Sequence, residues 1–416
     1  MLIYRELAIG VLFMTITINN KTINFELTTS TRLLLDIAYK KVGKSITFLC
    51  ISPISKETVV AALRAAKSVD APIIFASSLN QVDVNGGYTG WTPKKFIEFV
   101  NQVSRSMDLN GMILFELDHG GPWLKDEHIS RGFDYYGALE SVKKSIESFI
   151  EAGFHILHID TSIDKESSTG FADIDVAARR TVELIEYSED VARYKNNRII
   201  EYEIGSDRWS LNNVDLFKKF VSLVINMLKS KNIDTSKIVF AVADVGTRVK
   251  PGNRLNISLA SRFVDVLKEY GAYLKIHSAD YLENPSDLPK SSIGGANIGP
   301  MFAHIQYKTV KELIVSSEKD HLLKLFKERI DSNIISSDKL GKYFNNLEKI
   351  EEYKIGLASR YIWANNNVRN TIHSIGSELG IDIFSKCIEA IENSIKEYLI
   401  QLNLIGTVSL FRRYLK

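Results

Sequence analysis

The sequence predicts a (β/α)8 barrel, a TIM barrel of the α/β class, because short apolar runs alternate with longer amphipathic runs from residue 46 onward. This alternation is typical of repeated βα units around a parallel sheet. Eight apolar runs are present, and eight βα units come to roughly 250 residues, the usual size of a closed barrel. A doubly wound sheet generally has about five or six strands, so the number of runs favours the barrel.

The expected strands follow one another in chain order. The first four are ITFLCIS from Ile46, APIIFASS from Ala71, GMILFELDHG from Gly111 and HILHIDTS from His155. The last four are RIIEYEIG from Arg198, KIVFAVADVG from Lys237, AYLKIHSAD from Ala272 and SIGGANIGP from Ser292. Segments between them, such as KETVVAALRAAKSVD and LASRFVDVLKEYG, place apolar residues at helical spacing. The seventh helix is the weakest element, because YLENPSDLPKSS is short and contains prolines.

Three regions are expected along the chain. Residues 1–45 are an N-terminal extension and lead-in: MLIYRELAIGVLFM is apolar but too short to span a bilayer, and it lacks a small-residue cleavage site. Residues 46–320 form the barrel. The strand pattern stops after about residue 320, and four amphipathic runs from His321 to Leu404 predict a helical appendage, residues 321–416, that packs on the barrel.

Composition excludes several classes of protein. The chain has 416 residues, 45% hydrophobic and 25% charged, which is ordinary for a soluble globular protein. Lys and Arg number 52 against 50 Asp and Glu, a balance that argues against a nucleic-acid surface or a polybasic membrane patch. Cys50 and Cys387 lie far apart, so neither a disulfide framework nor a cysteine zinc site is expected. We therefore expect a cytoplasmic protein, with homo-oligomerisation left open.

Titratable residues end several expected strands, where barrel enzymes carry their catalytic groups. They are Asp118, His119, His158, Asp160, Glu201, Glu203, Asp244, His277 and Asp280. Because alternate residues of a strand share a face, His158 and Asp160 point the same way. Imidazole and carboxylate groups hold Zn²⁺ or Mn²⁺ while leaving a position open, so we expect a metal site of His119, Glu203 and His277. Any one of these residues alone is more simply a solvated rim residue, but several converge.

A phosphate site is expected where a glycine-bearing turn leads into a helix N-terminus, because backbone N–H groups approach an anion closely there. The sequence IGGANIGP has this form at the eighth strand, where barrel enzymes frequently bind phosphate. Its candidate residues are Gly295, Asn297 and Gly299. The alternative is that Gly294 and Gly295 only allow tight packing of the barrel.

Basic and polar residues elsewhere are further candidates for substrate binding. Arg360 or Arg369 in RYIWANNNVRN is suited to bidentate phosphate binding, unless this segment only packs on the barrel with its arginines paired to acids. Arg248 and Lys250 are equally eligible. The loop NQVDVNGGYTGWTP offers three side chains to substrate hydroxyl groups: Asn80, Gln81 and Asp83.

Several of these segments resemble the tagatose-bisphosphate aldolase accessory-subunit family, which also contains ketose-6-phosphate 4-epimerases. The most specific segment is SSLNQVDVNGGYTGWTP from Ser77, and DHGGPW, YEIGSD, IHSADY and ANIGP follow it in the expected order. RYIWANNNVRN from Arg360 is similar to the family's Arg-Tyr-aromatic-Trp segment. More remotely, the order of Asp-His, Glu-hydrophobic-Gly and His-Ser-Ala-Asp resembles class II, metal-dependent ketose-bisphosphate aldolases. IHSADY adds Ser278 and Asp280 as substrate-binding candidates.

The resemblance to class II aldolases implies roles for individual residues. Asp118 would exchange a proton with the C4 hydroxyl, His119 and His277 would bind a divalent metal, and Glu203 would be a ligand or close neighbour. The sequence departs from that pattern after the sixth strand, where VADVGTRV has no histidine. Either no catalytic metal binds, or the metal shell is completed by water or a carboxylate, from Glu203, Asp160 or Asp244. Zn²⁺ is the expected ion, with Mn²⁺, Co²⁺ or Mg²⁺ as alternatives.

If the resemblance holds, the first functional expectation is 4-epimerisation of a ketose 6-phosphate, which interconverts the fructose and tagatose forms. Metal-assisted opening of the C3–C4 bond, with Asp118 taking and returning the O4 proton, would invert C4 by retro-aldol chemistry. Glu203 or Asp160 as a second base would instead serve direct deprotonation at C4, a position that the C2 carbonyl does not acidify.

Two other functions stay open. One is a non-catalytic subunit that stabilises a separate class II tagatose-1,6-bisphosphate aldolase, with the helical appendage as its docking surface. The presence of Asp118, His119, Glu203 and His277 as ionisable groups argues mildly against it. The other is a ketose-bisphosphate aldolase in its own right, which requires a complete metal shell.

Overall fold

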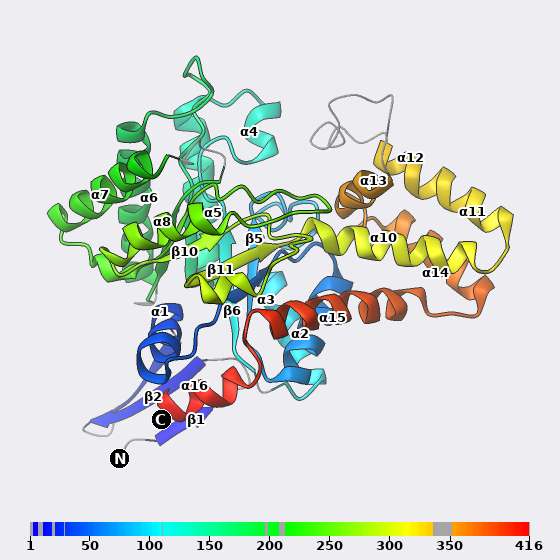
Figure 1. Cartoon of the computed structure of the whole chain (residues 1–416), viewed down its shortest axis with the longest axis horizontal. Helices are drawn as coiled ribbons and strands as arrows, with labels where there is room; N and C mark the ends of the chain where they lie inside the picture. The colour runs from blue at the N-terminus through cyan, green and yellow to red at the C-terminus, as the bar shows by residue number, and fades with distance from the viewer. Residues whose placement is uncertain are drawn as a thin grey trace.

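The computed structural model describes residues 3–6, 11–18, 21–28, 30–109, 111–195, 199–207, 213–335 and 352–415. Eight parallel strands close into a barrel in the order β10-β11-β4-β5-β6-β7-β8-β9, which confirms the predicted fold class (Figure 1). The strands are β4 (Phe48–Ile51), β5 (Ile73–Ser78), β6 (Ile113–Asp118), β7 (Ile156–Ile159), β8 (Glu201–Gly205), β9 (Ile238–Val242), β10 (Tyr273–Ile276) and β11 (Ile293–Ile298). Each lies within one of the eight expected runs.

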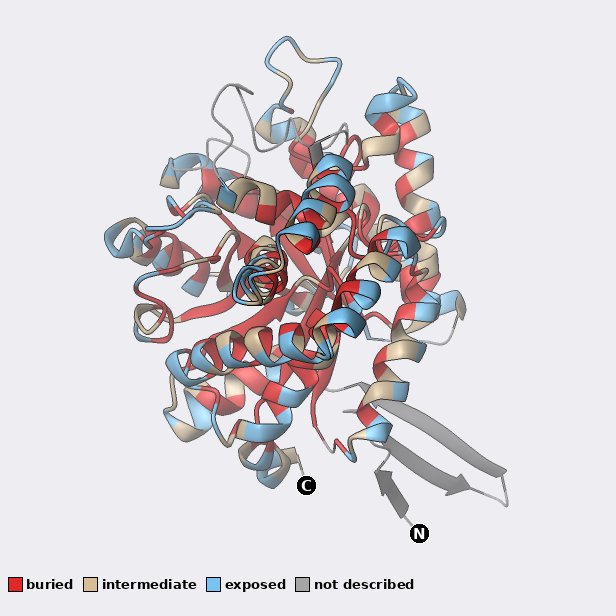
Figure 2. Ribbon diagram, turned by 90° about the vertical axis from the view of Figure 1, so that its right-hand side faces the viewer, coloured by how far each residue is buried: buried red, intermediate tan, exposed pale blue. Residues whose placement is uncertain are grey.

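Helices surround the barrel and bury its outer face. They are α2 (Lys56–Val69), α3 (Pro93–Ser106), α5 (Tyr135–Ala152), α6 (Ile174–Lys195), α7 (Val214–Ser230), α8 (Ile257–Lys268), α9 (Asp287–Lys290) and α10 (Pro300–Val315), with the short α4 (Asp126–Ser130) before α5. Capping residues fix where they begin: the Thr92 side chain accepts the N–H of Lys95, and Pro93 opens α3. The seventh helix, α9, is a single turn, as its prolines predicted. Figure 2 shows buried residues on the strands and exposed residues on the outward helix faces.

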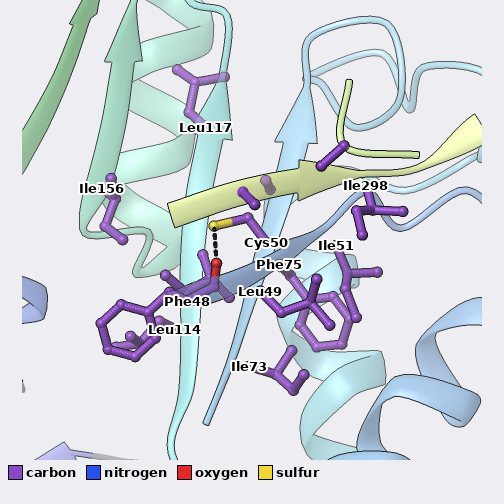
Figure 3. Packing of buried hydrophobic residues seen from close by; sticks show 14 of the residues in the cluster. Phe48, Leu49, Cys50, Ile51, Ile73, Phe75, Leu114, Leu117, Ile156 and Ile298 are labelled. Atoms are coloured by element: carbon purple, nitrogen blue, oxygen red, sulfur yellow. Dashed lines mark hydrogen bonds between the residues drawn. The ribbon is translucent and has the colours of Figure 1, made fainter. Parts of the chain in front are cut away.

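The layer between the strands and the surrounding helices is packed with apolar side chains, whereas the barrel interior also holds the buried polar side chains of Glu116, Glu203 and Lys275. All four residues of β4 are buried, and Leu49 and Ile51 lie with Phe75 and Ile298 from the neighbouring strands (Figure 3). Strands of a parallel sheet that are covered on both faces read as continuous apolar runs, which is why the sequence located them. The chemistry is therefore confined to the barrel's polar centre and its open end.

A carboxylate fixes the helix that lies at the N-terminal end of the barrel. Glu201, at the start of β8, accepts hydrogen bonds from Thr31 N (2.7 Å), Arg32 N (3.0 Å) and Ser30 Oγ (2.5 Å). These donors belong to the first turn of α1 (Thr31–Asp36), which continues into the π-helix η1 (Ile37–Val42). Glu201 was expected at a strand C-terminus, but it lies at the end of the barrel opposite the functional site.

The N-terminal region forms a separate sheet with strand order β1-β2-β3: Ile3–Glu6, Val11–Ile18 and Lys21–Thr28, paired antiparallel. The described residues of the apolar N-terminal stretch, 3–6 and 11–14, thus belong to strands. No helix in the described part of the chain is long and apolar enough to span a bilayer.

Helices follow the barrel, as the amphipathic runs predicted. They are α11 (Asp320–Phe326), the π-helix η3 (Lys327–Asp331), α12 (Ser332–Ile335), α13 (Glu352–Ala358), η5 (Ser359–Tyr361), α14 (Asn366–Leu379), α15 (Ile383–Gln401) and α16 (Thr407–Leu415). Helix α15 packs against α2 and α10 on one side of the barrel (Figure 1). The Tyr398 hydroxyl donates to Ala279 O (2.9 Å) in the loop after β10. Helix η5 packs against α10 and α13, and its Arg360 lies at the barrel mouth.

Candidate metal and active site

A cavity of about 650 Å³ lies at the C-terminal end of the barrel. Its walls come from the ends of all eight strands or the segments that follow them, and from η5. The titratable and polar residues on these walls include Asn80, Gln81, Asp118, His119, Lys165, His277, Ser278, Asp280, Asn297 and Arg360. The position agrees with the rule that barrel enzymes carry their active sites at this end.

Two histidines face each other across the cavity floor. His119 follows β6 and His277 follows β10, and Nε2 of His119 lies 3.1 Å from Nδ1 of His277. The other nitrogen of each ring contacts a carboxylate at 2.9 Å: His119 Nδ1 contacts Asp160 Oδ2, and His277 Nε2 contacts Glu203 Oε1. A carboxylate that accepts the N–H on one side of an imidazole leaves the lone pair of the second nitrogen free, as in metal-binding histidines.

The backbone after β6 is shaped to present His119. Its φ of 113° is unusual for a residue with a side chain, so the turn is held by its surroundings. Gly120 N donates to His158 O (2.7 Å), and a Cβ on Gly121 would lie 1.5 Å from Asp160 O. Only glycine fits this close approach of two chains. The motif DHGG therefore brings His119 against the end of β7.

His158, on β7, lies next to His119 and His277. Its Nε2 donates to Gly205 O (2.9 Å), and its Nδ1 lies 3.2 Å from Asp118 Oδ1. Asp118, His119, His158 and His277 each offer one ligand atom, and these four atoms lie within 4.8 Å of one another. His158 was not among the ligands expected from the sequence. The available signal was the alternation in HILHID, which points His158 inward together with Asp160.

This group fits a divalent metal. Two imidazole nitrogens about 2.0–2.1 Å from one tetrahedral Zn²⁺ are roughly 3.3 Å apart, close to the 3.1 Å between His119 and His277. All three imidazoles have an acceptor for their outer N–H. Imidazole and carboxylate ligands suit Zn²⁺ and the neighbouring first-row ions. The cluster is therefore a chemically complete candidate metal site, and it supplies a third histidine that the segment after β9 lacks.

Glu203 and Asp160 lie behind the histidines rather than on the cavity wall. Both are fully buried, and neither lines the cavity. Glu203 Oε2 lies 2.5 Å from Lys275 Nζ while its Oε1 contacts His277. Asp160 also accepts from Ser206 Oγ (3.0 Å). These positions suit the support of ligands, and Glu203 is a close neighbour of the site, one of the two roles expected for it. Its role as a ligand, and that of either residue as a second base, stays a prediction.

Asp118 is the carboxylate that borders both the histidines and the cavity. It is 8% exposed, and its Oδ1 lies 3.5 Å from His119 Nε2. Burial raises the pKa of Asp118, but the charges of His119 and His277 and the hydrogen bond from His158 outweigh it, and the pKa falls well below its usual range. The carboxyl group is therefore ionised at neutral pH.

The expected phosphate site at the start of α10 is occupied by the chain's own carboxylate. Asp280 Oδ1 accepts from Met301 N (2.7 Å) and Gly299 N (3.2 Å), the donors that IGGANIGP was expected to offer to phosphate. Burial raises the pKa of Asp280 to about 6, against the lowering effect of these hydrogen bonds. Gly295 lies inside β11, where a Cβ would lie 3.1 Å from Lys275 Cγ. Gly295 thus allows tight packing inside the barrel, which was the alternative to phosphate binding for this motif.

Three side chains do point to an anionic or polar ligand. Asn297 is only 6% exposed, and neither its Oδ1 nor its Nδ2 has a partner among the described residues. A buried amide without partners is costly unless a ligand or water satisfies it. Ser278 and Arg360 also line the cavity, and the Arg360 guanidinium lies 4.7 Å from the ring centroid of Tyr361.

The other basic candidates do not line the cavity. Arg369 pairs with the Glu57 carboxylate through two hydrogen bonds, of 2.8 and 3.2 Å, and so joins α14 to α2. Arg248 pairs in the same way with Asp244, at 2.8 and 2.9 Å. Lys250 is likewise absent from the wall, whereas Lys165, which the sequence analysis did not nominate, is on it.

The long loop after β5 is held together by its own polar side chains. Asn80 Nδ2 donates to Leu124 O (3.0 Å), and its Oδ1 accepts from Asp126 N (2.9 Å). Gln81 Oε1 accepts from Ser78 N (2.9 Å), and Asp83 forms a buried ion pair with Lys125 (2.5 Å). Asn80 and Gln81 line the cavity, but their amides shape its wall; Asp83 lies outside it.

Comparison with known proteins agrees with the expected relationship. A family model described as D-tagatose-1,6-bisphosphate aldolase subunit GatZ/KbaZ-like matches residues 34–208, which confirms the resemblance to this family. The chain is similar to the crystal structure of "a probable tagatose 6 phosphate kinase from Sinorhizobium meliloti 1021", with 19% identity, coverage of 88% and 99% of the two chains, and a TM-score of 0.69. The chain is also similar to the crystal structure of the fructose-bisphosphate aldolase of Campylobacter jejuni, with 12% identity, coverage of 91% of this chain and 96% of that chain, and a TM-score of 0.52. At these identities the likeness shows the shared fold.

Proposed function

We propose that this GatZ/KbaZ-like chain is a metal-dependent 4-epimerase of a ketose 6-phosphate, which interconverts fructose 6-phosphate and tagatose 6-phosphate by retro-aldol chemistry. The observation that carries the proposal is the position of Asp118. Its carboxylate borders the cavity beside the facing nitrogens of His119 and His277. A carboxylate placed there can exchange a proton with a substrate hydroxyl group next to a metal site.

The metal would be held by His119, His158 and His277, a set of three imidazoles that leaves a position open for substrate. Zn²⁺ is the ion that this donor set favours. When bound, the ion would supply Lewis-acid stabilisation of the negative charge that develops on substrate oxygens. Asp160 and Glu203 would keep His119 and His277 in the orientation that presents their free nitrogens.

Asp118 would act as both base and acid. Its ionised carboxylate takes the proton of the C4 hydroxyl as the C3–C4 bond breaks, leaving an aldehyde carbon at C4 and the electron pair on the three-carbon enediolate. Rotation of the aldehyde presents its other face. The C3–C4 bond then re-forms, Asp118 returns the proton to O4, and C4 is inverted. One carboxylate suffices for this route, which agrees with the positions of Glu203 and Asp160 behind the histidines.

The substrate phosphate would lie on the β10–β11 side of the cavity. Arg360 is suited to bidentate binding of phosphate oxygens, and Ser278 adds a hydroxyl group. Asn297 would bind a phosphate or hydroxyl oxygen through its buried amide, which lacks a protein partner among the described residues. With its phosphate on the β10–β11 side, the substrate would extend its sugar chain from there toward Asp118.

The direct test is incubation of the metal-replete protein with fructose 6-phosphate while tagatose 6-phosphate formation is followed. We expect turnover that is lost on EDTA treatment and in Asp118→Asn. Absence of turnover in folded protein with bound metal would contradict the proposal and favour a role as a partner subunit of an aldolase.

A further inference from the structure

We propose that Lys275 is a positioning residue of the metal site, which holds Glu203 behind His277 and keeps this carboxylate out of the ligand set. The inference rests on the proposed function, because it concerns the same metal centre. It goes beyond that function by assigning a role to a charged side chain in the barrel interior that neither lines the cavity nor contacts the three histidines.

The ammonium group of Lys275 lies among buried carboxylates. Lys275 is two residues before His277 on the same inward face of the barrel. Its Nζ contacts Glu116 Oε1 and lies 2.5 Å from Glu203 Oε2, and all three side chains are 0% exposed. A charge in the protein interior is costly unless it is paired with good geometry. The ammonium and the two carboxylates therefore fix one another in place.

Glu203 links Lys275 to the metal site, because each of its two carboxylate oxygens has a different partner. Oε2 binds the Lys275 ammonium, and Oε1 accepts the Nε2–H of His277 at 2.9 Å. With Nε2 protonated, His277 keeps the lone pair of Nδ1 directed at Nε2 of His119, 3.1 Å away. A carboxylate held through both oxygens does not turn toward a metal, although Glu203 and Asp118 oxygens lie within 4.8 Å.

The neighbouring strand leaves room for this lysine. Gly295 on β11 faces the Lys275 stem, and a Cβ at this position would lie 3.1 Å from Lys275 Cγ and 3.2 Å from its Cδ. The Lys275 ammonium also lies 5.6 Å from the centroid of the Phe240 ring. The glycine in IGGANIGP thus accommodates the lysine that orients the site.

The test compares Zn²⁺ affinity with stability in three variants. Lys275→Met removes the ammonium, and Lys275→Met/Glu116→Met removes it together with the other carboxyl group that it contacts. Lys125→Met removes a different buried lysine, which pairs with Asp83 at 2.5 Å and does not line the cavity. Zn²⁺ affinity is measured by competition with a chromophoric chelator, and stability by urea unfolding of the metal-free proteins.

We expect both Lys275 variants to bind Zn²⁺ about 10- to 100-fold more weakly, the usual cost of losing support behind a ligand. Lys125→Met should lose stability but keep wild-type Zn²⁺ affinity. If the double variant binds Zn²⁺ as tightly as the wild type, Glu203 needs no lysine to hold it behind His277 and the inference is wrong. A wild-type protein that binds no Zn²⁺ would instead overturn the proposed metal site itself.

A second variant keeps the test decisive if the Lys275 substitutions prevent folding. Gly295→Ala retains the ammonium but crowds the Lys275 stem, so it should shift the Lys275–Glu203 pair and weaken Zn²⁺ binding. Unchanged Zn²⁺ affinity in folded Gly295→Ala, with the lysine demonstrably displaced in its crystal structure, would contradict the assignment.

Discussion

Nε2 of His119 lies 3.1 Å from Nδ1 of His277, although the two histidines follow strands on opposite sides of the barrel. The contact exists because β6 and β10 both end at the cavity floor. Each ring is supported from behind by a carboxylate, Asp160 for His119 and Glu203 for His277. The closed barrel thus converts residues that are distant in sequence into one potential ligand set.

Substitution of Asp160 should weaken metal binding without emptying the ligand set. Asp160→Asn removes the charge that holds the Nδ1–H of His119, and we expect Zn²⁺ affinity to fall about 10- to 100-fold in chelator competition. Asp164→Asn is the matched control, because Asp164 pairs with Arg180 at 3.0 Å in the following loop. Equal Zn²⁺ affinity in Asp160→Asn and the wild type would show that His119 needs no such support.

Substitution of Asn297 should affect substrate binding more than folding. Asn297→Leu removes an amide whose polar atoms have no partner among the described residues, so the unfolding temperature should not fall. The KM for fructose 6-phosphate should rise roughly 5- to 30-fold, corresponding to one or two lost hydrogen bonds, with a smaller effect on kcat. A lower unfolding temperature with unchanged KM would identify Asn297 as a structural residue instead.

Substitutions of Arg360 and Arg369 should affect different properties: the KM for the substrate in the first case and the stability of the fold in the second. Arg360 lines the cavity and also donates to the Tyr361 hydroxyl group at 2.5 Å, so Arg360→Met should raise the KM for the phosphorylated sugar and lower the stability of the fold by less than Arg369→Met does. Arg369 is paired with Glu57, whose side chain is 4% exposed, so Arg369→Met should destabilise the fold by roughly 3 kcal/mol. If Arg360→Met lowers stability and spares KM, the phosphate site lies elsewhere.

Sequence predicted the fold well because its signals are local. Each strand of the barrel is an apolar run a few residues long, and β4, for example, lies within the run from Ile46. The weak seventh helix was also visible, since Pro289 lies inside the four residues of α9. The N-terminal strands were not predicted, because β2 and β3 pair with each other in a sheet outside the barrel pattern.

Within the candidate site, sequence located His119, His277 and the carboxylates Asp160 and Glu203, but not the contacts that hold them in place. His119 and His277 stand at strand ends, a position that can be read locally. The partner of Glu203 is Lys275, 72 residues away, and the partner of Arg369 is Glu57, 312 residues away. Such contacts are set by the closure of the barrel and the packing of later helices. The contact of Asp280 with the start of α10 could not be predicted either, because it also joins two different strand ends. The Asp280 carboxyl group accepts the N–H groups of Gly299 and Met301, so these donors do not bind phosphate.

Asp280 should give the stability of the protein a measurable pH dependence. Its pKa is raised by burial to about 6, above about 3.9 in an unfolded chain. The folded protein therefore binds this proton more tightly. The stability that comes from protonation of Asp280 is fully present below about pH 4 and is lost as the pH rises through about 6. Asp280→Asn removes the dependence, so the variant should gain stability relative to the wild type between pH 4 and 8, by at most about 3 kcal/mol.

Urea unfolding of both metal-free proteins across this pH range measures the effect. A difference in unfolding free energy that stays constant with pH would mean that the Asp280 carboxyl group titrates alike in the folded and unfolded chains.

The central claim is that a metal held by the cavity histidines and the Asp118 carboxylate together invert C4 of a ketose 6-phosphate. The most direct measurement follows fructose 6-phosphate and tagatose 6-phosphate by ¹³C NMR, with Zn²⁺-loaded wild type, EDTA-treated wild type and Zn²⁺-loaded Asp118→Asn. We expect interconversion by the first sample only, with Asp118→Asn slower by about 10²- to 10⁴-fold while it still binds Zn²⁺. Folded, Zn²⁺-loaded wild type that leaves fructose 6-phosphate unchanged, or Asp118→Asn that turns over at the wild-type rate, would contradict the account.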